Sequence, residues 1–443
     1  MVLDKALIFL SVPHLRERDV AQMEHLRELV AGGEIAELTP TFPCVTCPVQ
    51  ANMLTGTLPR KHGVIANGFF WREKRQVEMW TSPVDCFDQP LIWQRLRECS
   101  SPRRSAIWFA QHIKGADADL VCTPAPVHHP DGSETPWCYT RPAELYGQLR
   151  ERLGDFPLHH YWGPLAGVPA SQWIVDSAIL AAGQFRPDFF YIYFPLLDYA
   201  AQRSGPDSPE AYSALAEADK LIGRLAEGMR SVYGDQIIWL IAGEYVITPV
   251  ASACFPNRIL REEGYLSVIK RDDGEYVDWE RSRAFTLVDH QVAHLFVLDG
   301  QAETVSRLAE IFRHQPEIER VLTRADLPAW GLDHPRSGEL ILVAQPTCWF
   351  AYYWWEDDEL APSFARKVDI HNKPGYDPLE LFWDRAAGGV PLQPELIRGS
   401  HGAPAEDPSQ RTVVLISEPA HLPEKPLADV DMFEVIVRLC RLS

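Results

Sequence analysis

The strongest constraint on the fold is a strand–helix–strand pattern near the middle of the chain. Two apolar runs of strand length, Asp188–Phe194 and Gln236–Ala242, flank a longer segment, Ser208–Tyr233. The apolar residues of that segment recur with a helical period: Leu215, Ala218, Leu221, Ile222 and Leu225. Two strands joined by such a helix usually run parallel, through a right-handed crossover. The pattern therefore predicts an α/β fold with a mostly parallel sheet and helices on both faces.

Segments on either side of this unit support the same fold class. Ala6–Val12 is an apolar run that predicts a buried strand, and Asp19–Val30 predicts an amphipathic helix that ends at Gly32. The first run is much shorter than the ~18 residues of a membrane span, and no basic leader precedes it, so we interpret it as a strand. Three further strands are predicted, at Ala106–Phe109, Ala284–Leu298 and Glu339–Ala344.

Two stretches of the chain interrupt the alternation of strands and helices. Thr123–Pro142 and Trp355–Pro394 are rich in Pro, His and Gly and have weak periodicity, which is typical of long loops or of a cap over a site. We expect a single domain over residues 1–443, because one elaborated α/β domain can reach this length. Within it we expect inserted cap segments at 115–165 and 345–395.

The charge balance narrows the possible partners. The chain has 61 acidic and 42 basic residues, so its net charge is −19. Such a charge disfavours a nucleic-acid duplex or an anionic membrane surface, but it allows a small phosphate ester in a local pocket. The nine cysteines are an odd, scattered set rather than a disulfide framework. We therefore expect a cytoplasmic protein with reduced thiols and a small phosphorylated substrate, and the oligomeric state stays open.

Two residue clusters allow both a functional and a structural interpretation. Trp349, Trp354 and Trp355 could line an apolar pocket, but the burial preferences of aromatic residues favour packing in the core or cap. Cys44 and Cys47 have the spacing of a redox or zinc half-site. No second pair with zinc spacing accompanies them, so two small buried apolar side chains explain this pair as well.

The segment around Thr46 combines a hydroxyl group with the start of a helix. Thr46 lies in a proline-bounded turn before a short helical run, Val49–Leu54. Amides at a helix N-terminus can hold a phosphate and lower the cost of negative charge on an attacking oxygen. The alternative is that Thr46 caps the helix, with its hydroxyl accepting a hydrogen bond from a backbone amide.

The same segment resembles the nucleophile region of the type I phosphodiesterase/nucleotide pyrophosphatase branch of the alkaline phosphatase superfamily. In that family a Thr followed by x-Pro precedes Thr-Gly, Pro, His-Gly and Asn. The matching residues occur here in the same order: Thr46, Pro48, Thr55-Gly56, Pro59, His62-Gly63 and Asn67. The resemblance implies an alkaline phosphatase-like α/β fold. It also implies that Thr46 is the nucleophile and that Asn67 donates to a nonbridging phosphate oxygen.

Later segments extend the resemblance over most of the chain. Tyr191–Phe194 followed by Asp198 resembles the second metal segment of the family. Gly243–Val250 occupies the place of its Ser-Asp-His-Gly-Met segment, and Arg398–Gly402 resembles its closing Gly-x-His-Gly. Asp369–Phe382 resembles a signature of uncharacterised bacterial members.

The departures from the family concern its metal site. The family binds two zinc ions, which stabilise the attacking and the leaving oxygen of an in-line displacement. The position of its first Asp ligand falls at Ser11 to Pro13, which offers no carboxylate. The second-segment ligands become Pro195 and Tyr199, and the Asp-His pair becomes Glu244-Tyr245. Thr46 and His401 match, so the matched positions alone cannot assemble a standard two-zinc site.

Other side chains could hold a divalent ion in a different way. Asp198, Glu244 and His401 would give an oxygen-rich site with one imidazole, suited to zinc or manganese. His290 and His294 share one face of a strand, and with Asp289 they form a second candidate cluster for a metal or a phosphate. Asp369 and His371 are further candidates. The structural alternative for any one of these histidines is a hydrogen-bonded core or surface residue.

Two functions follow from the resemblance and its departures. The first is a metal-dependent hydrolase of phosphodiester or pyrophosphate bonds in a small molecule, in which Thr46 forms a phospho-threonine intermediate. The second is a degenerate family member that binds a metabolite or a protein partner without turnover, because fold does not imply function.

Overall fold

The first apolar run forms the middle of a nine-stranded sheet with the order β23-β2-β22-β11-β1-β10-β5-β6-β9. The computed structural model describes residues 5–99, 101–128, 134–419, 421–423 and 426–442. Strand β1 (Ala6–Val12) is buried along its whole length and pairs in parallel with β10 (Phe189–Tyr193) and β11 (Ile237–Gly243). A strand that is covered on both faces needs the continuous apolar sequence that β1 has.

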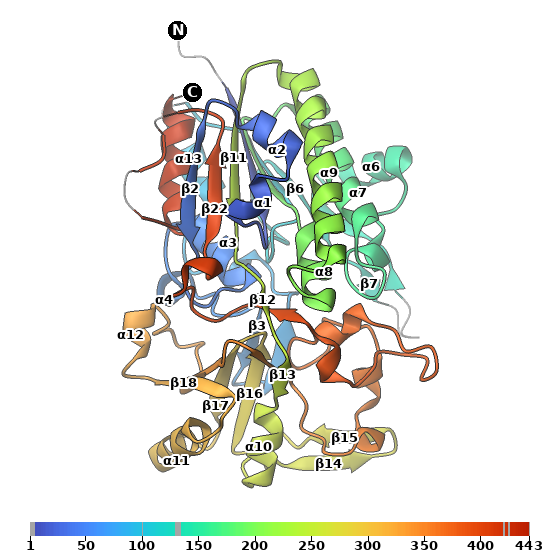
Figure 1. The fold of residues 1–443 in the computed structure, drawn as a ribbon, viewed down its shortest axis with the longest axis vertical. Coiled ribbons are helices and arrows are strands. Elements are labelled where there is room, and N and C mark those ends of the chain that lie inside the picture. The colour runs from blue at the N-terminus through green and yellow to red at the C-terminus, as the bar shows by residue number, and fades with distance from the viewer. Residues whose placement is uncertain (1–4, 100, 129–133, 420, 424–425, 443) are drawn as a thin grey trace.

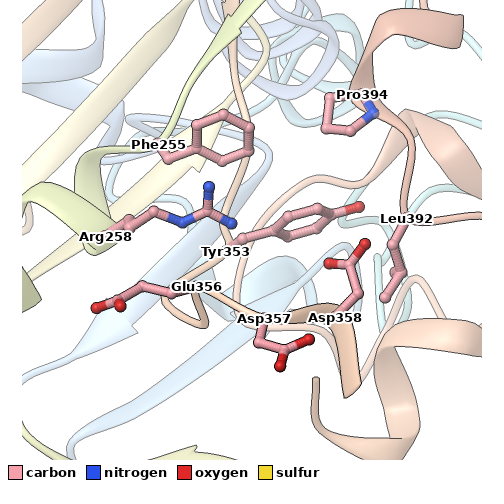
Figure 2. Close-up of a pocket in the computed structure, with 8 residues that line it drawn as sticks. All are labelled: Phe255, Arg258, Tyr353, Glu356, Asp357, Asp358, Leu392 and Pro394. Atoms are coloured by element: carbon pink, nitrogen blue, oxygen red, sulfur yellow. The ribbon is translucent and has the colours of Figure 1, made fainter. Parts of the chain in front are cut away.

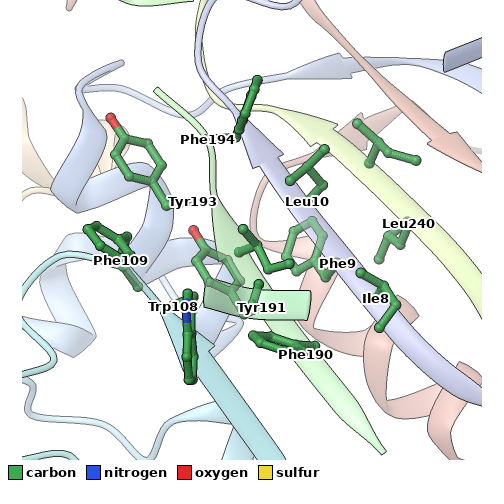
Figure 3. Packing of buried hydrophobic residues seen from close by; sticks show 14 of the residues in the cluster. Ile8, Phe9, Leu10, Trp108, Phe109, Phe190, Tyr191, Tyr193, Phe194 and Leu240 are labelled. Carbon is green, nitrogen blue, oxygen red and sulfur yellow. The ribbon is translucent and has the colours of Figure 1, made fainter. Parts of the chain in front are cut away.

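The outer strands complete a mostly parallel sheet. β5 and β6 continue the parallel set, whereas β9 and β22 run antiparallel to their inner neighbours. Figure 3 shows the aromatic core of this sheet, in which the Phe9 and Tyr191 rings meet edge to face at 5.2 Å. The predicted α/β fold class is thus confirmed. The bounds of the outer strands are β2 Glu34–Thr39, β5 Ser105–Trp108, β6 Leu120–Pro124, β9 Cys138–Arg141, β22 Thr412–Ile416 and β23 Leu427–Ala428.

Helices cover both faces of this sheet, and Figure 1 shows α9 and α7 on one side and α13 and α3 on the other. The predicted crossover helix is α9 (Pro209–Tyr233), and it packs on α7 (Val168–Phe185) and α2 (Glu24–Leu29). The other group is α3 (Thr46–Thr55) and α13 (Asp431–Leu442), which also contacts α5 (Ile92–Arg97). The remaining helices of this half are α4 Pro59–His62, α6 Leu145–Leu153 and α8 Leu196–Ser204.

The predicted helix over Asp19–Val30 is wrong in one respect, because the segment forms two short helices. These are α1 (Glu17–Val20) and α2. The reason lies in the buried carboxylate of Asp219 on α9, which accepts hydrogen bonds from the backbone N–H groups of His25 (3.1 Å) and Leu26 (2.9 Å). A new helix N-terminus supplies such free N–H groups, whereas a continuous helix would have used them internally.

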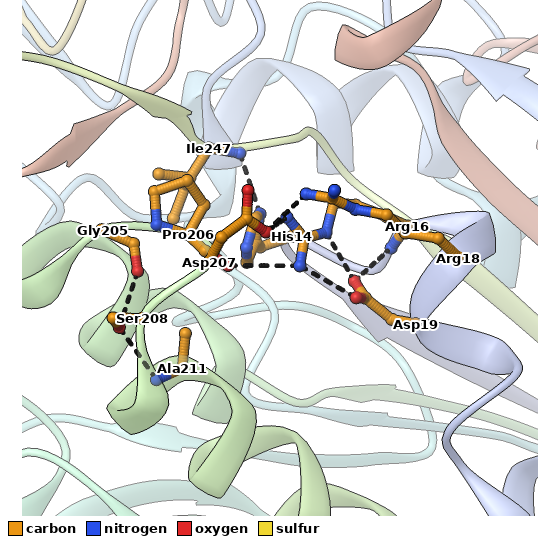
Figure 4. A network of polar contacts seen from close by, with 10 residues as sticks. All are labelled: His14, Arg16, Arg18, Asp19, Gly205, Pro206, Asp207, Ser208, Ala211 and Ile247. Atoms are coloured by element: carbon orange, nitrogen blue, oxygen red, sulfur yellow. Dashed lines mark hydrogen bonds and ion pairs between the residues drawn. The ribbon is translucent and has the colours of Figure 1, made fainter.

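Ion pairs hold the loop after β1 against the loop before α9, as Figure 4 shows. Arg16 donates to Asp19 at 2.7 Å and to Asp207 at 2.8 Å. Ser208 then caps α9 by accepting a hydrogen bond from the backbone N–H of Ala211. Because β1 and α9 are thereby tied together, the carboxyl end of the central sheet has a fixed geometry.

A second, four-stranded antiparallel sheet with the order β16-β17-β19-β18 forms the lower half of the molecule in Figure 1. The single strand predicted over Ala284–Leu298 is instead a hairpin of β16 (Ala284–Asp289) and β17 (Val292–Val297). The chain reverses at His290, which has a φ of 60°. The other elements around this sheet are β18 Ile318–Thr323, β19 Leu340–Ala344, α10 Pro256–Glu262, α11 Ala302–Arg313 and α12 Leu327–Trp330.

The second sheet has its own hydrophobic core, and Trp349, Trp354 and Trp355 are buried in it. The structural interpretation of these tryptophans is therefore confirmed. Short paired strands fill the remaining connections: β3 Gly68–Trp71, β4 Gln76–Met79, β12 Thr248–Pro249, β13 Ser252–Cys254, β14 Val268–Arg271, β15 Gly274–Val277, β20 Cys348–Phe350 and β21 Gly399–Ser400.

The two predicted loop stretches differ from each other. The loop prediction over Thr123–Pro142 is wrong in part, because the stretch includes β7 (Val127–His128), β8 (Glu134–Thr135) and β9, which pairs with β6 at the edge of the central sheet. Its residues 129–133 lie outside the described part. Trp355–Pro394 contains short 3₁₀ turns in place of α-helices or extended strands. The single domain and the exact cap bounds, 115–165 and 345–395, stay predictions.

Candidate functional site

Thr46 begins α3 at the carboxyl end of the central sheet. The residue at the N-cap position is Val45, and the Thr46 hydroxyl makes no capping hydrogen bond. Thr46 is buried but lines a cavity, and its Oγ1 lies 3.0 Å from the phenolic oxygen of Tyr245. The capping alternative for Thr46 is therefore wrong, because its hydroxyl is directed to another side chain.

A chain of hydrogen bonds continues from Thr46 into the site. Tyr245 donates its phenolic proton to Asp198 Oδ1 at 3.1 Å, which leaves Thr46 as the donor to Tyr245. Gln202 donates to the other oxygen of Asp198 at 2.6 Å, and Tyr376 donates to Gln202 at 2.7 Å. Burial raises the pKa of Asp198 to about 6, although the hydrogen bonds from Tyr245 and Gln202 oppose the shift.

Asn67 braces the start of α3 instead of facing the cavity. Its side-chain oxygen accepts a hydrogen bond from the backbone N–H of Cys47 at 2.8 Å. Its side-chain nitrogen donates to Asp289 Oδ1 at 2.9 Å. Asn67 is fully buried and is absent from the residues that line the cavity. Its predicted contact with phosphate stays a prediction, and the observed contacts give it a positioning role beside Thr46.

Glu244 lies beneath the site in a polar niche. Its Oε1 accepts hydrogen bonds from Ser11 at 2.7 Å and from Gln50 at 2.9 Å, whereas its Oε2 has no hydrogen-bond partner. Burial raises the pKa of Glu244 to about 8, and the hydrogen bonds from Ser11 and Gln50 oppose this shift. Glu244 is therefore mainly the neutral acid at pH 7.

Replacing Glu244 by Gln tests this protonation state. A carboxyl whose pKa is raised on folding stabilises the fold at low pH, and that stability is lost as the pH rises through the folded-state value. With a folded pKa of about 8, wild type should lose about 2 kcal/mol relative to Glu244→Gln between pH 6 and pH 8. Urea unfolding of both proteins at pH 6 and pH 8 measures this change in the free energy of unfolding. The buried histidines titrate in both proteins, so their contribution cancels in the comparison. A difference that is independent of pH would contradict the prediction.

The predicted histidines separate into two groups. His290 and His401 meet at the site, with ring centroids 3.8 Å apart, and Tyr245 stacks on His401 at 3.6 Å. The Nδ1–H of His401 donates to the carbonyl oxygen of Cys44 at 2.8 Å, and its Nε2 has no hydrogen-bond partner. His294 points elsewhere, to Ile65 O and the N–H of Gly338.

The second candidate cluster is therefore only partly assembled. Asp289 and His290 lie 2.7 Å apart and belong to the site, because His290 also lines the cavity. His294 does not join them. Asp369 and His371, from the predicted cap segment 345–395, line the same cavity. Burial raises the pKa of Asp289 to about 6 and lowers that of His290, so the imidazole is neutral at pH 7.

The arrangement does not fit the two-zinc site of the family. Among the described residues, no group of three His, Cys, Asp or Glu side chains lies in a metal-binding arrangement. Both Asp198 oxygens are occupied by hydrogen bonds from Tyr245 and Gln202. Tyr245, whose hydroxyl is hydrogen-bonded to Thr46, stacks on His401, and His401 lies against His290. Nε2 of His401 and Oε2 of Glu244 have no hydrogen-bond partner, and they are the two atoms of this site left to coordinate a metal.

The cavity at Thr46 has a volume of about 1130 Å³. Thr46, Tyr245 and Asp198 lie next to one another in its lining, which also includes residues of both predicted cap segments. A second cavity of about 460 Å³, shown in Figure 2, lies between Arg258, Tyr353 and Leu392 in the lower half. It contains none of the predicted site residues.

Sequence reasoning missed Tyr245 and Tyr376 as site residues. The sequence pattern identifies Tyr245 only as a substituted ligand position, and nothing in it singles out Tyr376, which lines the cavity. The signal for Tyr245 was its position next to Glu244 after a central strand, because loops at the carboxyl ends of parallel strands hold the sites of α/β proteins.

Cys44 and Cys47 are buried free thiols whose pKa values are raised by burial, which supports the structural interpretation of this pair.

Solved structures with the same fold include two kinds of enzyme. Phosphonoacetate hydrolase from Sinorhizobium meliloti 1021 aligns over 99% of this chain and 96% of its own, with a TM-score of 0.65 and 16% identity. Murine ectonucleotide pyrophosphatase / phosphodiesterase 5 aligns over the same shares, with a TM-score of 0.62 and 12% identity. These similarities confirm the alkaline phosphatase-like fold.

No helix in the described ranges has the length and apolar character needed to cross a membrane.

Sequence comparison gives the family. An uncharacterized pyrophosphatase/phosphodiesterase of Schizosaccharomyces pombe is 25% identical over 198 residues, which are 44% of this chain. The chain spans only 34% of the length of that relative. Residues 8–377 match the family described as type I phosphodiesterase / nucleotide pyrophosphatase. The chain therefore belongs to the type I phosphodiesterase / nucleotide pyrophosphatase family.

Proposed function

We propose that the protein hydrolyses a phosphodiester or pyrophosphate bond in a small molecule, with Thr46 as the nucleophile. The observation that carries this proposal is the position of Thr46, whose hydroxyl faces the cavity at the start of α3. The hydroxyl is held by Tyr245 rather than used as a helix cap. A hydroxyl fixed beside a cavity needs little reorganisation to attack a bound ester.

In the proposed reaction the Thr46 oxygen forms a bond to phosphorus while its proton passes through Tyr245 to Asp198. The bond from phosphorus to the leaving oxygen breaks, and the leaving oxygen takes a proton from water. Water then hydrolyses the phospho-threonine, which still carries the retained ester or phosphate group, and regenerates the hydroxyl. Tyr245 orients Thr46 through the hydrogen bond of 3.0 Å. Asp198 in turn orients Tyr245.

The second candidate is a protein that binds a phosphorylated metabolite or a partner without hydrolysis. Two observations favour it: Tyr245 stands in place of a metal-ligating His, and the described residues offer no metal-binding group. Dependence on zinc or manganese therefore stays a prediction, and no step of the proposed reaction is routed through a metal.

A turnover assay separates the two functions. Purified protein is incubated with bis(4-nitrophenyl) phosphate and with a dinucleoside pyrophosphate, with chelator, without additions, and with added zinc or manganese. The hydrolase predicts release of product in at least one condition, with loss of that product formation in Thr46→Ala. Absence of turnover in every condition would favour the second candidate, and turnover that survives the chelator would refute metal dependence.

A further inference from the structure

Large apolar side chains are exposed around the cavity at Thr46. Leu165 is 60% exposed, Trp383 51% and Val368 39%, and all three line this cavity. Exposed apolar side chains scattered singly are ordinary, but a group of them around one concavity indicates a surface that a ligand covers. The lining also includes the apolar side chains of Trp80, Trp162, Ile370 and Phe382, beside polar groups such as those of Ser82 and Gln111.

The apolar walls are held in place by contacts between the two cap segments. A Cβ atom at Gly163 would lie 3.2 Å from Cγ1 of Val368, so these segments touch at the cavity mouth. Trp162 donates its indole proton to Glu380 at 2.6 Å, and its ring lies 5.7 Å from that of Tyr376. The apolar surface is therefore built before any ligand arrives, which lowers the entropic cost of binding.

The charges around the cavity suit one phosphate group better than several. Its lining includes two cations, Lys114 and Arg385, both of which are exposed. It also includes two carboxyl groups, those of Asp198 and Asp369. A chain of phosphates would need several buried cations or a glycine-rich loop of backbone amides, as in phosphate-cradling loops. The described lining offers neither.

We infer that the cavity selects a phosphodiester that carries one negative charge and one large apolar alcohol, which Trp383 contacts. This inference rests on the proposed function, because Thr46 marks the end at which the phosphate is placed. A cavity of about 1130 Å³ holds an alcohol of the size of a drug-like ligand. A nucleoside ester would place its polar base and ribose groups in a lining where apolar side chains prevail, and each of those groups left unpaired there would cost affinity.

Binding of phosphonate esters is measured in a Thr46→Ala background, here and for the variants below, because that protein lacks the proposed nucleophile and leaves the P–O bonds of the esters intact. The measurement therefore tests the inference independently of turnover. Butyl, octyl and adenosine-5′ esters of methylphosphonic acid carry the same single charge, and calorimetric titration below the critical micelle concentration gives their Kd values. We expect octyl to bind more tightly than butyl by at least about tenfold, since each buried methylene contributes about two- to fourfold in affinity. We also expect octyl to bind more tightly than the adenosine ester.

Two variants locate the contact. Trp383→Ala should lower the ratio of octyl to butyl affinity by at least about threefold, because it removes apolar surface that the longer chain covers. Trp137→Ala is the matched control, since Trp137 is 36% exposed and lies outside the cavity. Equal affinity for butyl and octyl, tighter binding of the adenosine ester, or an unchanged ratio in Trp383→Ala would overturn the inference. A protein that prefers octyl but hydrolyses no ester would retain the inference and lose only the proposed function.

Discussion

Replacing Thr46 by Ala is expected to lower kcat for phosphodiester hydrolysis by at least about a thousandfold, or about 4 kcal/mol in activation free energy. The variant lacks the oxygen that would form the bond to phosphorus. The fold should persist, because the Thr46 hydroxyl makes one hydrogen bond, to Tyr245, and the N-cap position of α3 belongs to Val45. Losing one such hydrogen bond costs about 1 kcal/mol of stability.

Two controls make the Thr46 result specific. Thr46→Ser keeps a hydroxyl and should retain measurable turnover, whereas Thr57→Ala, just beyond the same helix, should leave kcat within about twofold. Mass spectrometry of acid-quenched protein should find a phosphoryl group that still carries the retained alcohol on the peptide that contains Thr46 in wild type and not in Thr46→Ala. Full turnover in a correctly folded Thr46→Ala protein would exclude Thr46 as the nucleophile.

Replacing Lys373 by Met should destabilise the fold by roughly 3–5 kcal/mol, the typical cost of breaking a buried ion pair from one side. The ammonium group of Lys373 lies 2.7 Å from Asp377 and 2.9 Å from Glu380, and all three side chains are buried. Burial lowers the pKa of Lys373, but the two carboxylates outweigh it and raise that pKa overall. Without the ammonium group, two like charges would remain in the interior.

The effect should concentrate in the cap segment that carries Lys373. Glu380 also accepts hydrogen bonds from Trp162 and from the backbone N–H of Asp369, so the cluster joins both walls of the cavity. Hydrogen exchange should report faster exchange around residues 365–382, and urea unfolding should report the loss of stability. Lys367→Met, at an exposed position, is the matched control and should change stability by less than about 0.5 kcal/mol.

A triple variant separates charge from packing in this cluster. Lys373→Met combined with Asp377→Asn and Glu380→Gln removes the unpaired charges and should recover part of the lost stability. If the triple variant were less stable than Lys373→Met alone, the buried charges would not be the cause of the destabilisation.

Several secondary structure predictions were confirmed because they depend on local patterns. β1 has the predicted bounds, Ala6–Val12, and α9 begins within a residue of the predicted Ser208 start. The prediction over Ala284–Leu298 failed because only the short polar segment Asp289–Gln291 interrupts the apolar residues, and no Gly or Pro marks the turn at His290. The helix over Asp19–Val30 failed for a tertiary reason, the distant carboxylate of Asp219.

The candidate site was predictable to a lesser extent. Thr46, Asp198 and His401 do gather at the carboxyl end of the central sheet, and Tyr245 contacts each of them. From the sequence, Tyr245 is only a lost metal-ligand position. In the structure it is a hydrogen-bond partner of both Thr46 and Asp198. The roles proposed for the site residues in catalysis and metal binding, and the cytoplasmic location, stay predictions.

The sequence by itself determined the α/β class and the family of this protein, because hydrophobic periodicity and the order of short motifs are properties of the chain. Only the tertiary structure decided which polar groups share the site. His290 and His294 are four residues apart, but a turn at His290 directs their rings to different places. Thr46 and Tyr245 are 199 positions apart in the sequence, yet their side-chain oxygens lie 3.0 Å apart. They meet because parallel strands bring their carboxyl ends to one edge of the sheet.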